Sequence, residues 1–236
     1  MKPNLNKVPR HLAIILDGNR RFSRRLMLKP YKGHEWGAKK LDKFFNWCIE
    51  YKIKELTLYC FSLENRNRPK LEFDYLMNLF RKEFKIFHSD PRIEKYNIKV
   101  NFIGRLNIFP KDIQILMHKI MNKTKDNKKF IINFAMGYGG RTEIIDAVKK
   151  IAKQVKQGKL NINKINEETF AKNLYIDSEP DLIIRTGGEK RTSNFLNYQA
   201  AYSELIFIDK LWPEFEKEDF ISCLEDYSTR ERRLGK

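Results

Sequence analysis

The chain has 236 residues, of which 42% are hydrophobic and 33% are charged, and its formal net charge is +17 at pH 7. This composition is typical of a globular protein and argues against disorder, and no apolar run approaches the roughly 18 residues of a membrane span. Three widely spaced cysteines argue against a disulfide framework or a CxxC metal site, so we expect a reduced, cytoplasmic protein: Cys48, Cys60 and Cys223.

Six short apolar runs bounded by polar or glycine residues predict β-strands. They fall at residues 11–16, 55–61, 98–104, 129–136, 181–185 and 204–208. Between them, apolar residues repeat at helical spacing over 41–49, 73–87, 113–121, 144–155 and 220–227. Pro110 and Pro213 suit the starts of the third and last of these helices.

The alternation of strands and helices predicts the fold class. Strands that are apolar on both faces are typical of a parallel sheet that is covered on both sides. No Pro/Gly/Ser linker, repeat or low-complexity block divides the chain. We therefore expect an α/β protein with one domain, residues 1–236, built on a mostly parallel sheet flanked by helices.

The first strand is followed by a charged loop, Asp17-Gly18-Asn19-Arg20-Arg21. Glycine lets the backbone approach a ligand closely, and guanidinium groups suit the oxygens of a diphosphate. An aspartate among these cations would repel a phosphate unless it held Mg²⁺, which prefers one or two carboxylates plus substrate phosphates. Taken alone, the segment could equally be a glycine turn with surface arginines.

Two further loops repeat this pattern after later strands. Residues 62–69 supply a hydroxyl, a carboxylate, an amide and two arginines, and residues 185–195 combine two glycines with Arg185, Arg191 and Ser193. Carboxyl ends of parallel strands meet at one edge of a sheet, where ligands bind. Two separate arginine sets at this edge predict sites for two diphosphates, and hence for two substrates. Each loop alone could instead be a polar or glycine turn.

Several ordered motifs resemble the signature regions of the cis-prenyltransferases, the undecaprenyl and polyprenyl diphosphate synthases. The matching segments are HLAIILDGNRR from residue 11, GH at 33–34, FSLENRNRP from 61, YGGR from 138, IRTGGE from 184 and LWPEF from 211. The resemblance runs from about residue 8 to the C-terminus. It implies a six-stranded parallel sheet with a hydrophobic tunnel, and a homodimer that uses Mg²⁺.

The resemblance also implies the activity. Members of this family condense isopentenyl diphosphate units onto an allylic diphosphate, farnesyl or geranylgeranyl diphosphate, to make a Z-polyprenyl diphosphate, the precursor of a glycosyl carrier lipid. The chemistry agrees, because ionising a bond to diphosphate needs preorganised cations and a metal rather than a strong nucleophile. Contact with a membrane surface for product release is a further expectation.

Roles for individual residues follow from the same resemblance. Asp17 would hold the metal, with Glu204 as a second contact, and Asn65 would be the proton acceptor. The allylic diphosphate would lie among Gly18, Asn19, Arg20, Arg21, Phe22 and His34. Ser62, Leu63, Glu64, Asn65, Arg66 and Arg68 would shape the space between the substrates, and Arg185, Arg191, Thr192 and Ser193 would bind isopentenyl diphosphate. Arg233 and Gly235 would reach across the dimer.

The chain departs from the family pattern at four positions. Phe22 stands where tryptophan is common, and a ring is kept. Pro30 stands where many members have arginine, so a neighbouring lysine would have to supply that charge. Arg66 replaces a tryptophan and exchanges an aromatic wall for a cation. Arg20 is typical of the Arg-Arg form of archaeal and eukaryotic members.

Two other functions are compatible with parts of the sequence. A non-catalytic partner subunit of a heteromeric prenyltransferase would tend to lack the first-loop aspartate and the arginines, which are present here. Nucleic-acid binding rests on net charge alone, and the lysines are spread over helix faces without a recognised motif, so no nucleic acid is expected. For product length, Phe130 is the predicted tunnel residue, although aromatic residues at such spacings usually belong to a core.

Overall fold

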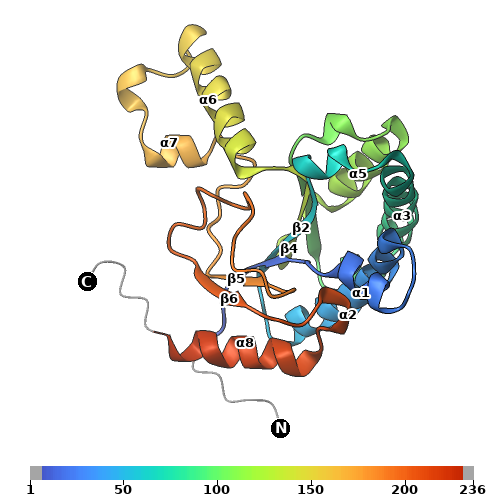
Figure 1. The fold of residues 1–236 in the computed structure, drawn as a ribbon. Coiled ribbons are helices and arrows are strands. Elements are labelled where there is room, and N and C mark those ends of the chain that lie inside the picture. Colours follow the sequence, from blue (N-terminus) through green and yellow to red (C-terminus); the bar gives the residue numbers. More distant parts are fainter. Residues whose placement is uncertain (1–6, 231–236) are drawn as a thin grey trace.

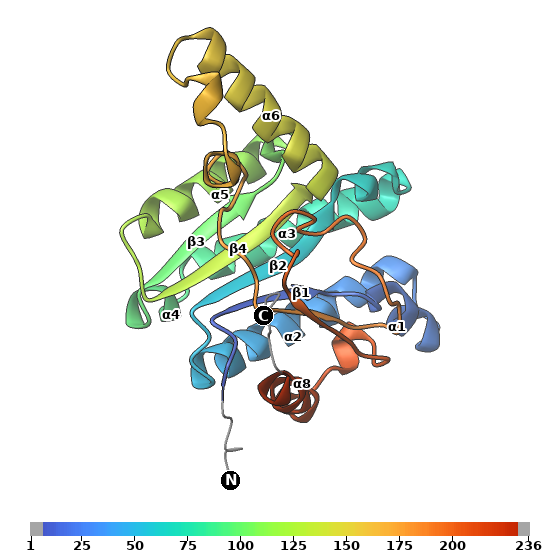
Figure 2. The same ribbon diagram turned by 90° about the vertical axis from the view of Figure 1, so that its left-hand side faces the viewer.

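The computed structural model describes residues 7–230. Six strands form one parallel sheet in the order β3-β4-β2-β1-β5-β6 (Figures 1 and 2). The strands are β1 (His11–Ile15), β2 (Glu55–Ser62), β3 (Ile98–Ile103), β4 (Phe130–Tyr138), β5 (Leu182–Arg185) and β6 (Glu204–Phe207). Every expected strand is present, and each end lies within two residues of its predicted position, so the predicted fold class is confirmed.

Five long helices lie where apolar periodicity predicts them. They are α2 (Gly33–Glu50), α3 (Lys70–His88), α5 (Lys111–Thr124), α6 (Gly140–Lys156) and α8 (Lys217–Thr229). Three short helices were not predicted, because four to seven residues carry too few periodic positions: α1 (Asn19–Arg25), α4 (Arg92–Lys95) and α7 (Glu167–Ala171).

The proline expected to begin the last helix does not do so. Pro213 lies in a separate 3-10 turn, Trp212–Glu214. The helix α8 begins at Lys217, where the side chain of Asp219 accepts the backbone N–H of Glu216 at 2.8 Å. Pro110, by contrast, directly precedes α5 as expected.

The two faces of the sheet are covered differently. The larger core packs α2, α3, α5 and α8 against one face, and it includes the fully buried Phe44, Ile113 and Phe220. On the other face, Phe195 and Leu196 of the coil after β5 pack against strand residues. The helix α6 leans away from the sheet together with α7 (Figures 1 and 2). No helix in residues 7–230 is long and apolar enough to cross a membrane.

The sheet order brings the charged loops together. β1 lies between β2 and β5, and Ile15 is paired with Tyr59 on one side and Arg185 on the other. The segments that follow these three strands therefore leave the same edge of the sheet, as the sequence predicts.

Candidate active site

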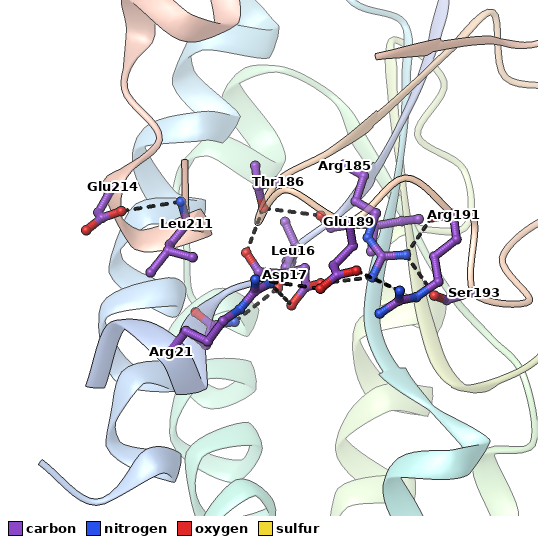
Figure 3. Close-up of polar contacts among 12 residues, drawn as sticks. Leu16, Asp17, Arg21, Arg185, Thr186, Glu189, Arg191, Ser193, Leu211 and Glu214 are labelled. Carbon is purple, nitrogen blue, oxygen red and sulfur yellow. Dashed lines mark hydrogen bonds and ion pairs between the residues drawn. The ribbon is translucent and has the colours of Figure 1, made fainter. Parts of the chain in front are cut away.

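An ion pair between the ends of β1 and β5 lies at the centre of this edge. Nη2 of Arg185 donates to Oδ2 of Asp17 at 2.9 Å, and its Nη1 donates to Oγ of Ser193 at 2.7 Å and to the carbonyl of Arg191 at 2.5 Å (Figure 3). The side chain of Arg185 is only 5% exposed. This buried guanidinium therefore orients the Asp17 carboxylate and folds the following loop around itself.

The backbone of Asp17 is fixed from two directions. Its carbonyl accepts the hydroxyl of Thr186 at 2.8 Å and the backbone N–H of Trp212 at 2.9 Å. A second guanidinium, that of Arg21, lies 3.2 Å from Oδ1. The carboxylate thus lies between two arginines while keeping part of its surface exposed.

Two glycines allow the loops to come this close. Gly187 has a φ of +90°, and a Cβ there would lie 3.2 Å from Cγ of Asp17 and 2.6 Å from Nη2 of Arg21. Gly18 has a φ of +112°, and its Cβ would lie 2.8 Å from Cα of Leu211. Side chains at these positions would be both strained and obstructed.

A small cationic pocket opens beside Asp17. Its volume is about 250 Å³, and its lining comprises Leu16, Asp17, Gly18, Asn19, Arg20, Arg21, Arg24, His34 and Arg68. Asn19, Arg20 and Arg21 belong to α1 and not to a loop, which corrects the sequence interpretation. Guanidinium groups converging on one small space can bind the oxygens of a phosphate or diphosphate.

His34 at the start of α2 is held in its neutral form. Burial, with the positive charges of Arg68 and Arg20, lowers the pKa of His34 to about 3. Nη1 of Arg68 lies 3.3 Å from Nε2 of His34, and arginine can only donate. We therefore place the imidazole proton on Nδ1. Arg68 itself is held by Glu72, whose Oε1 accepts from Nη1 at 2.9 Å.

The segment after β2 is closed by a reciprocal pair of hydrogen bonds. Oδ1 of Asn65 accepts the backbone N–H of Ser62 at 3.1 Å, and Oγ of Ser62 accepts the N–H of Asn65 at 3.3 Å. This capping box begins the 3-10 turn Leu63–Asn67. Ser62 and Asn65 both line the main cavity, so the cap also fixes part of its wall.

The main cavity has a volume of about 880 Å³ and changes character along its length. Its polar end includes Asp17, Asn19, His34, Ser62, Glu64, Asn65, Arg68, Arg185, Thr192 and Ser193. Its apolar wall lies between α2 and α3 and includes Leu41, Phe45, Leu76, Leu79, Phe80, Phe84, Phe87 and Phe134. A polar mouth on an apolar cavity can hold an amphiphile with an anionic head.

Some predicted residues lie beside these cavities without lining them. Leu63 and Arg66 are outside both, as are Phe22 and the side chain of Arg191. The ring of Phe22 packs against Trp36 with centroids 5.8 Å apart. Arg191 is largely exposed and donates to Glu189 at 2.7 Å. Arg233 and Gly235 fall outside the described residues.

Within one chain, the structure places Glu204 away from Asp17. This residue begins β6 and is paired with Leu182, three residues before Arg185. At about 3.3 Å per strand residue, Glu204 lies roughly 10 Å from the level of Arg185, toward the amino ends of the strands. Its Oε2 accepts from Nη1 of Arg230 at 2.9 Å. Within one chain Glu204 is therefore a partner of Arg230. Its expected contact with the metal at Asp17 stays a prediction.

The expected tunnel residue does not line the cavity. Phe130 and Phe134, on the same face of β4, are both 4% exposed and both belong to the core, but only Phe134 also lines the cavity. Other polar residues line these cavities without having been predicted, among them Arg24, Arg141, Asn194 and Asn197. Arg141 could have been predicted as a site residue, because it follows a strand as the predicted arginines do. The backbone N–H of Arg141 donates to Oδ1 of Asn194 at 2.9 Å.

Comparisons with known proteins agree with this geometry. The family model described as "Putative undecaprenyl diphosphate synthase" matches residues 15–235. A tritrans,polycis-undecaprenyl-diphosphate synthase (geranylgeranyl-diphosphate specific) from Pyrococcus horikoshii is 46% identical over 97% of this chain and 88% of its own length. An isoprenyl transferase from Thermus thermophilus is 44% identical over 97% and 89%.

Two solved structures share the fold. Lavandulyl diphosphate synthase from Lavandula x intermedia, in complex with dimethylallyl diphosphate, has a TM-score of 0.89 and 32% identity, covering 97% of this chain and 99% of its own. A "probable undecaprenyl diphosphate synthase" from Campylobacter jejuni has a TM-score of 0.80 and 33% identity, covering 98% and 100%.

Proposed function

This chain belongs to the undecaprenyl diphosphate synthase family of cis-prenyltransferases, which condense isopentenyl diphosphate onto an allylic diphosphate, and we propose that its primer is geranylgeranyl diphosphate. One structural observation supports this function most strongly: a single cavity of about 880 Å³ joins the charged mouth at Asp17 and Arg185 to an apolar wall. Curated relatives named as geranylgeranyl-diphosphate specific support the choice of primer. The product would be a long Z-polyprenyl diphosphate, the precursor of a glycosyl carrier lipid.

The small pocket is the proposed site of the allylic diphosphate. Arg20, Arg21 and Arg24 bring three guanidinium groups to a space that also includes the first turn of α1. Loss of diphosphate from an allylic carbon leaves negative charge on the departing oxygens, and fixed cations stabilise that charge without reorganising. His34, neutral and protonated on Nδ1, would supply a hydrogen bond rather than a charge.

Mg²⁺ is the proposed cofactor, and the donor set at Asp17 fits it. The described residues contain no group of three or more His, Cys, Asp or Glu side chains that could hold a metal alone. A single carboxylate among arginines suits Mg²⁺, which is commonly held by one or two carboxylates together with substrate phosphates. When bound there, the ion would neutralise charge on the leaving diphosphate. Asp17 is the residue we propose as its protein ligand.

The second substrate, isopentenyl diphosphate, would bind on the opposite side of Asp17. Thr192 and Ser193 line the cavity there, and Arg141 of α6 joins them. Arg191 is exposed beside this group and would close over the diphosphate. The guanidinium of Arg185 already donates hydrogen bonds to Asp17, Ser193 and the carbonyl of Arg191. We therefore propose that Arg185 positions this subsite, with its remaining surface facing the cavity.

Asn65 lies between the two proposed subsites. An amide is too weak a base to hold a proton at neutral pH, and Oδ1 of Asn65 already accepts the N–H of Ser62. We therefore propose that Asn65 orients the isopentenyl chain, and that the proton lost on condensation passes to an oxygen of a bound diphosphate. The unassigned Nδ2 of Asn65 is available to hold that oxygen in place.

We also propose that the whole chain is one catalytic domain that works as a homodimer. The helix α6 extends beyond the sheet and exposes Ile145 and Val148, and the nearby turn exposes Ile162 (Figure 1). Leu205 is partly exposed on β6, the edge strand. Apolar residues gathered on a projecting helix and a sheet edge are typical of an interface between copies.

The rival function, a non-catalytic partner subunit, fits less well, because a subunit without activity has no need of an assembled anion site. The test incubates the full chain with Mg²⁺, labelled isopentenyl diphosphate and, separately, dimethylallyl, geranyl, farnesyl or geranylgeranyl diphosphate. We expect elongated products, with the highest kcat/KM for geranylgeranyl diphosphate. A higher kcat/KM for farnesyl diphosphate would overturn the primer assignment, and no product from any primer would support the rival.

A further inference from the structure

The turn after α1 exposes three consecutive apolar side chains. Leu26 is 47% exposed, Met27 96% and Leu28 41%. The indole of Trp36 on α2 is also partly exposed, and it packs on Phe22, one turn before Leu26. Large apolar side chains on a soluble surface usually occur singly, so a contiguous group calls for an explanation.

The turn is a defined structure and not a fraying end. The N–H of Leu28 donates to the carbonyl of Ser23 at 2.9 Å, and that of Met27 donates to Arg24 at 3.0 Å. Met27, at the apex, has a φ of +56°, a conformation that glycine or asparagine adopts at lower cost. The chain thus holds a long apolar side chain in a strained position that exposes it almost completely.

Basic residues flank this group. Arg24, Arg25 and Lys29 are neighbours in sequence and are exposed, and Lys39 is exposed one helical turn after Trp36. Arg25 is paired with Glu214 at 3.0 Å, which leaves Arg24, Lys29 and Lys39 as the cations that would face a partner. The whole chain carries a formal charge of +17. Apolar side chains flanked by basic ones match the interface of a bilayer that contains anionic phospholipid.

We propose that residues 26–29, here called the apolar turn, insert into the surface of an anionic phospholipid bilayer, with Trp36 and Lys39 at the headgroup level. The surface is next to the site, because Arg24 lines the small pocket two residues before Leu26. In Figure 1, α1 and the blue segment after it lie at the edge of the molecule away from α6 and α7. Docking here would place the opening of the active site next to the lipid surface, while α6 points away from the membrane.

The test is flotation of the full chain, without substrates, with two kinds of vesicle: phosphatidylcholine alone, and equal parts of phosphatidylcholine and phosphatidylglycerol. We expect flotation mainly with the anionic vesicles. The variant L26S/M27N/L28S should lose about ten-fold or more in vesicle affinity, because three buried apolar side chains are removed. K29Q and K39Q should each lose about five-fold with anionic vesicles, from roughly one surface charge apiece.

The matched control is Ile115→Ser, which removes an apolar side chain that is 48% exposed on α5, far from the turn in sequence. It should float like the wild type.

Condensation of a short primer in detergent checks that each variant is folded, and the apolar-turn variant should keep wild-type turnover there. Failure of the wild type to float, or equal flotation of the apolar-turn variant, would overturn the proposal. A change of the variant's oligomeric state with unchanged flotation would instead assign this surface to a second copy of the chain. None of these outcomes depends on the identity of the primer.

Discussion

Arg185 and Asp17 share an ion pair whose two members are unequally buried. Nη2 of Arg185 lies 2.9 Å from Oδ2 of Asp17, and the side chains are 5% and 29% exposed, respectively. The cation is therefore held mainly by the protein, whereas the carboxylate keeps a larger free face toward the cavity. Removing either member should thus have different consequences for stability and for turnover.

We expect Asp17→Asn to lower kcat by at least about 100-fold, which corresponds to roughly 3 kcal/mol of transition-state stabilisation. The amide oxygen can still accept from Arg185, so the free energy of unfolding should change little. Asp17→Ala should lose the same activity and also about 1–3 kcal/mol of stability, because the buried guanidinium loses its acceptor. Steady-state kinetics and urea titration measure both. The exposed pair Arg81–Asp112 offers Asp112→Asn as a control, and a D17N variant with near wild-type kcat would refute the metal assignment.

Arg191→Ala should raise KM for isopentenyl diphosphate by about ten-fold and leave the fold intact, because this arginine is 61% exposed and a charge-assisted bond to a diphosphate is worth roughly 1.5 kcal/mol. Arg185→Ala should instead lower the free energy of unfolding. KM for each substrate is measured separately. If only the KM for the primer rose, the assignments of the two subsites would have to be reversed.

Phe134→Ala should lengthen the products, since this side chain faces the cavity. Phe130→Ala should leave product length unchanged and lower stability by about 3–5 kcal/mol, the usual cost of emptying a buried aromatic position. Chromatography of the reaction products compares the two. Longer products from the F130A variant, with products of unchanged length from F134A, would show that Phe130 limits product length, as the sequence predicts.

The pKa of about 3 for His34 predicts how stability depends on pH. An unfolded histidine titrates near 6.5, so between pH 6.5 and 3 the unfolded chain binds a proton that the folded chain does not. The stability that His34 contributes is complete above pH 6.5 and is lost as the pH falls toward 3. The free energy of unfolding of His34→Gln should fall less steeply over this interval than that of the wild type. His118→Gln, on α5, is the control, and parallel curves for wild type and H34Q would contradict the assignment.

Val148→Glu on α6 should convert the proposed dimer into monomers, because it places a charge in an apolar contact. The wild-type side chain is 48% exposed in the single chain, so the folded monomer should tolerate the change. Analytical ultracentrifugation measures the mass, and Ile115→Glu on α5 is the matched control. An unchanged dimer in V148E would place the interface elsewhere.

Much of the fold could be predicted from the sequence because its strands are simple apolar runs. All five residues of β1 are buried, and the charge that follows marks the strand's end unambiguously. The short helix α1 could not be predicted in this way, since its seven residues are mostly arginine and carry no apolar repeat. It packs instead against the 3-10 turn Pro30–Lys32 and against α2, contacts that an apolar repeat within seven residues does not reveal.

The sequence predicted the position of some site residues and not of others, for physical reasons that differ between residues. Residues at or just after the carboxyl end of a strand, such as Ser62 and Asp17, lie at the predicted edge. Glu204 is the first residue of β6, so it lies near the amino ends of the strands, and the family resemblance does not report which subunit a residue serves. Phe130 and Phe134 share one face of β4, and their spacing does not reveal which of the two borders a cavity.

The bond between Asp17 and Arg185 spans 168 positions of the chain. During translation, β1 leaves the ribosome first, but its neighbour β5 is synthesised only after about three quarters of the protein. The residues that line the cationic pocket are therefore synthesised long before the arginine that orients their carboxylate, and long-range pairings of this kind also close slowly. Catalytic competence consequently arrives late in biosynthesis, and a message truncated before codon 185 would yield a chain that is unable to ionise a primer.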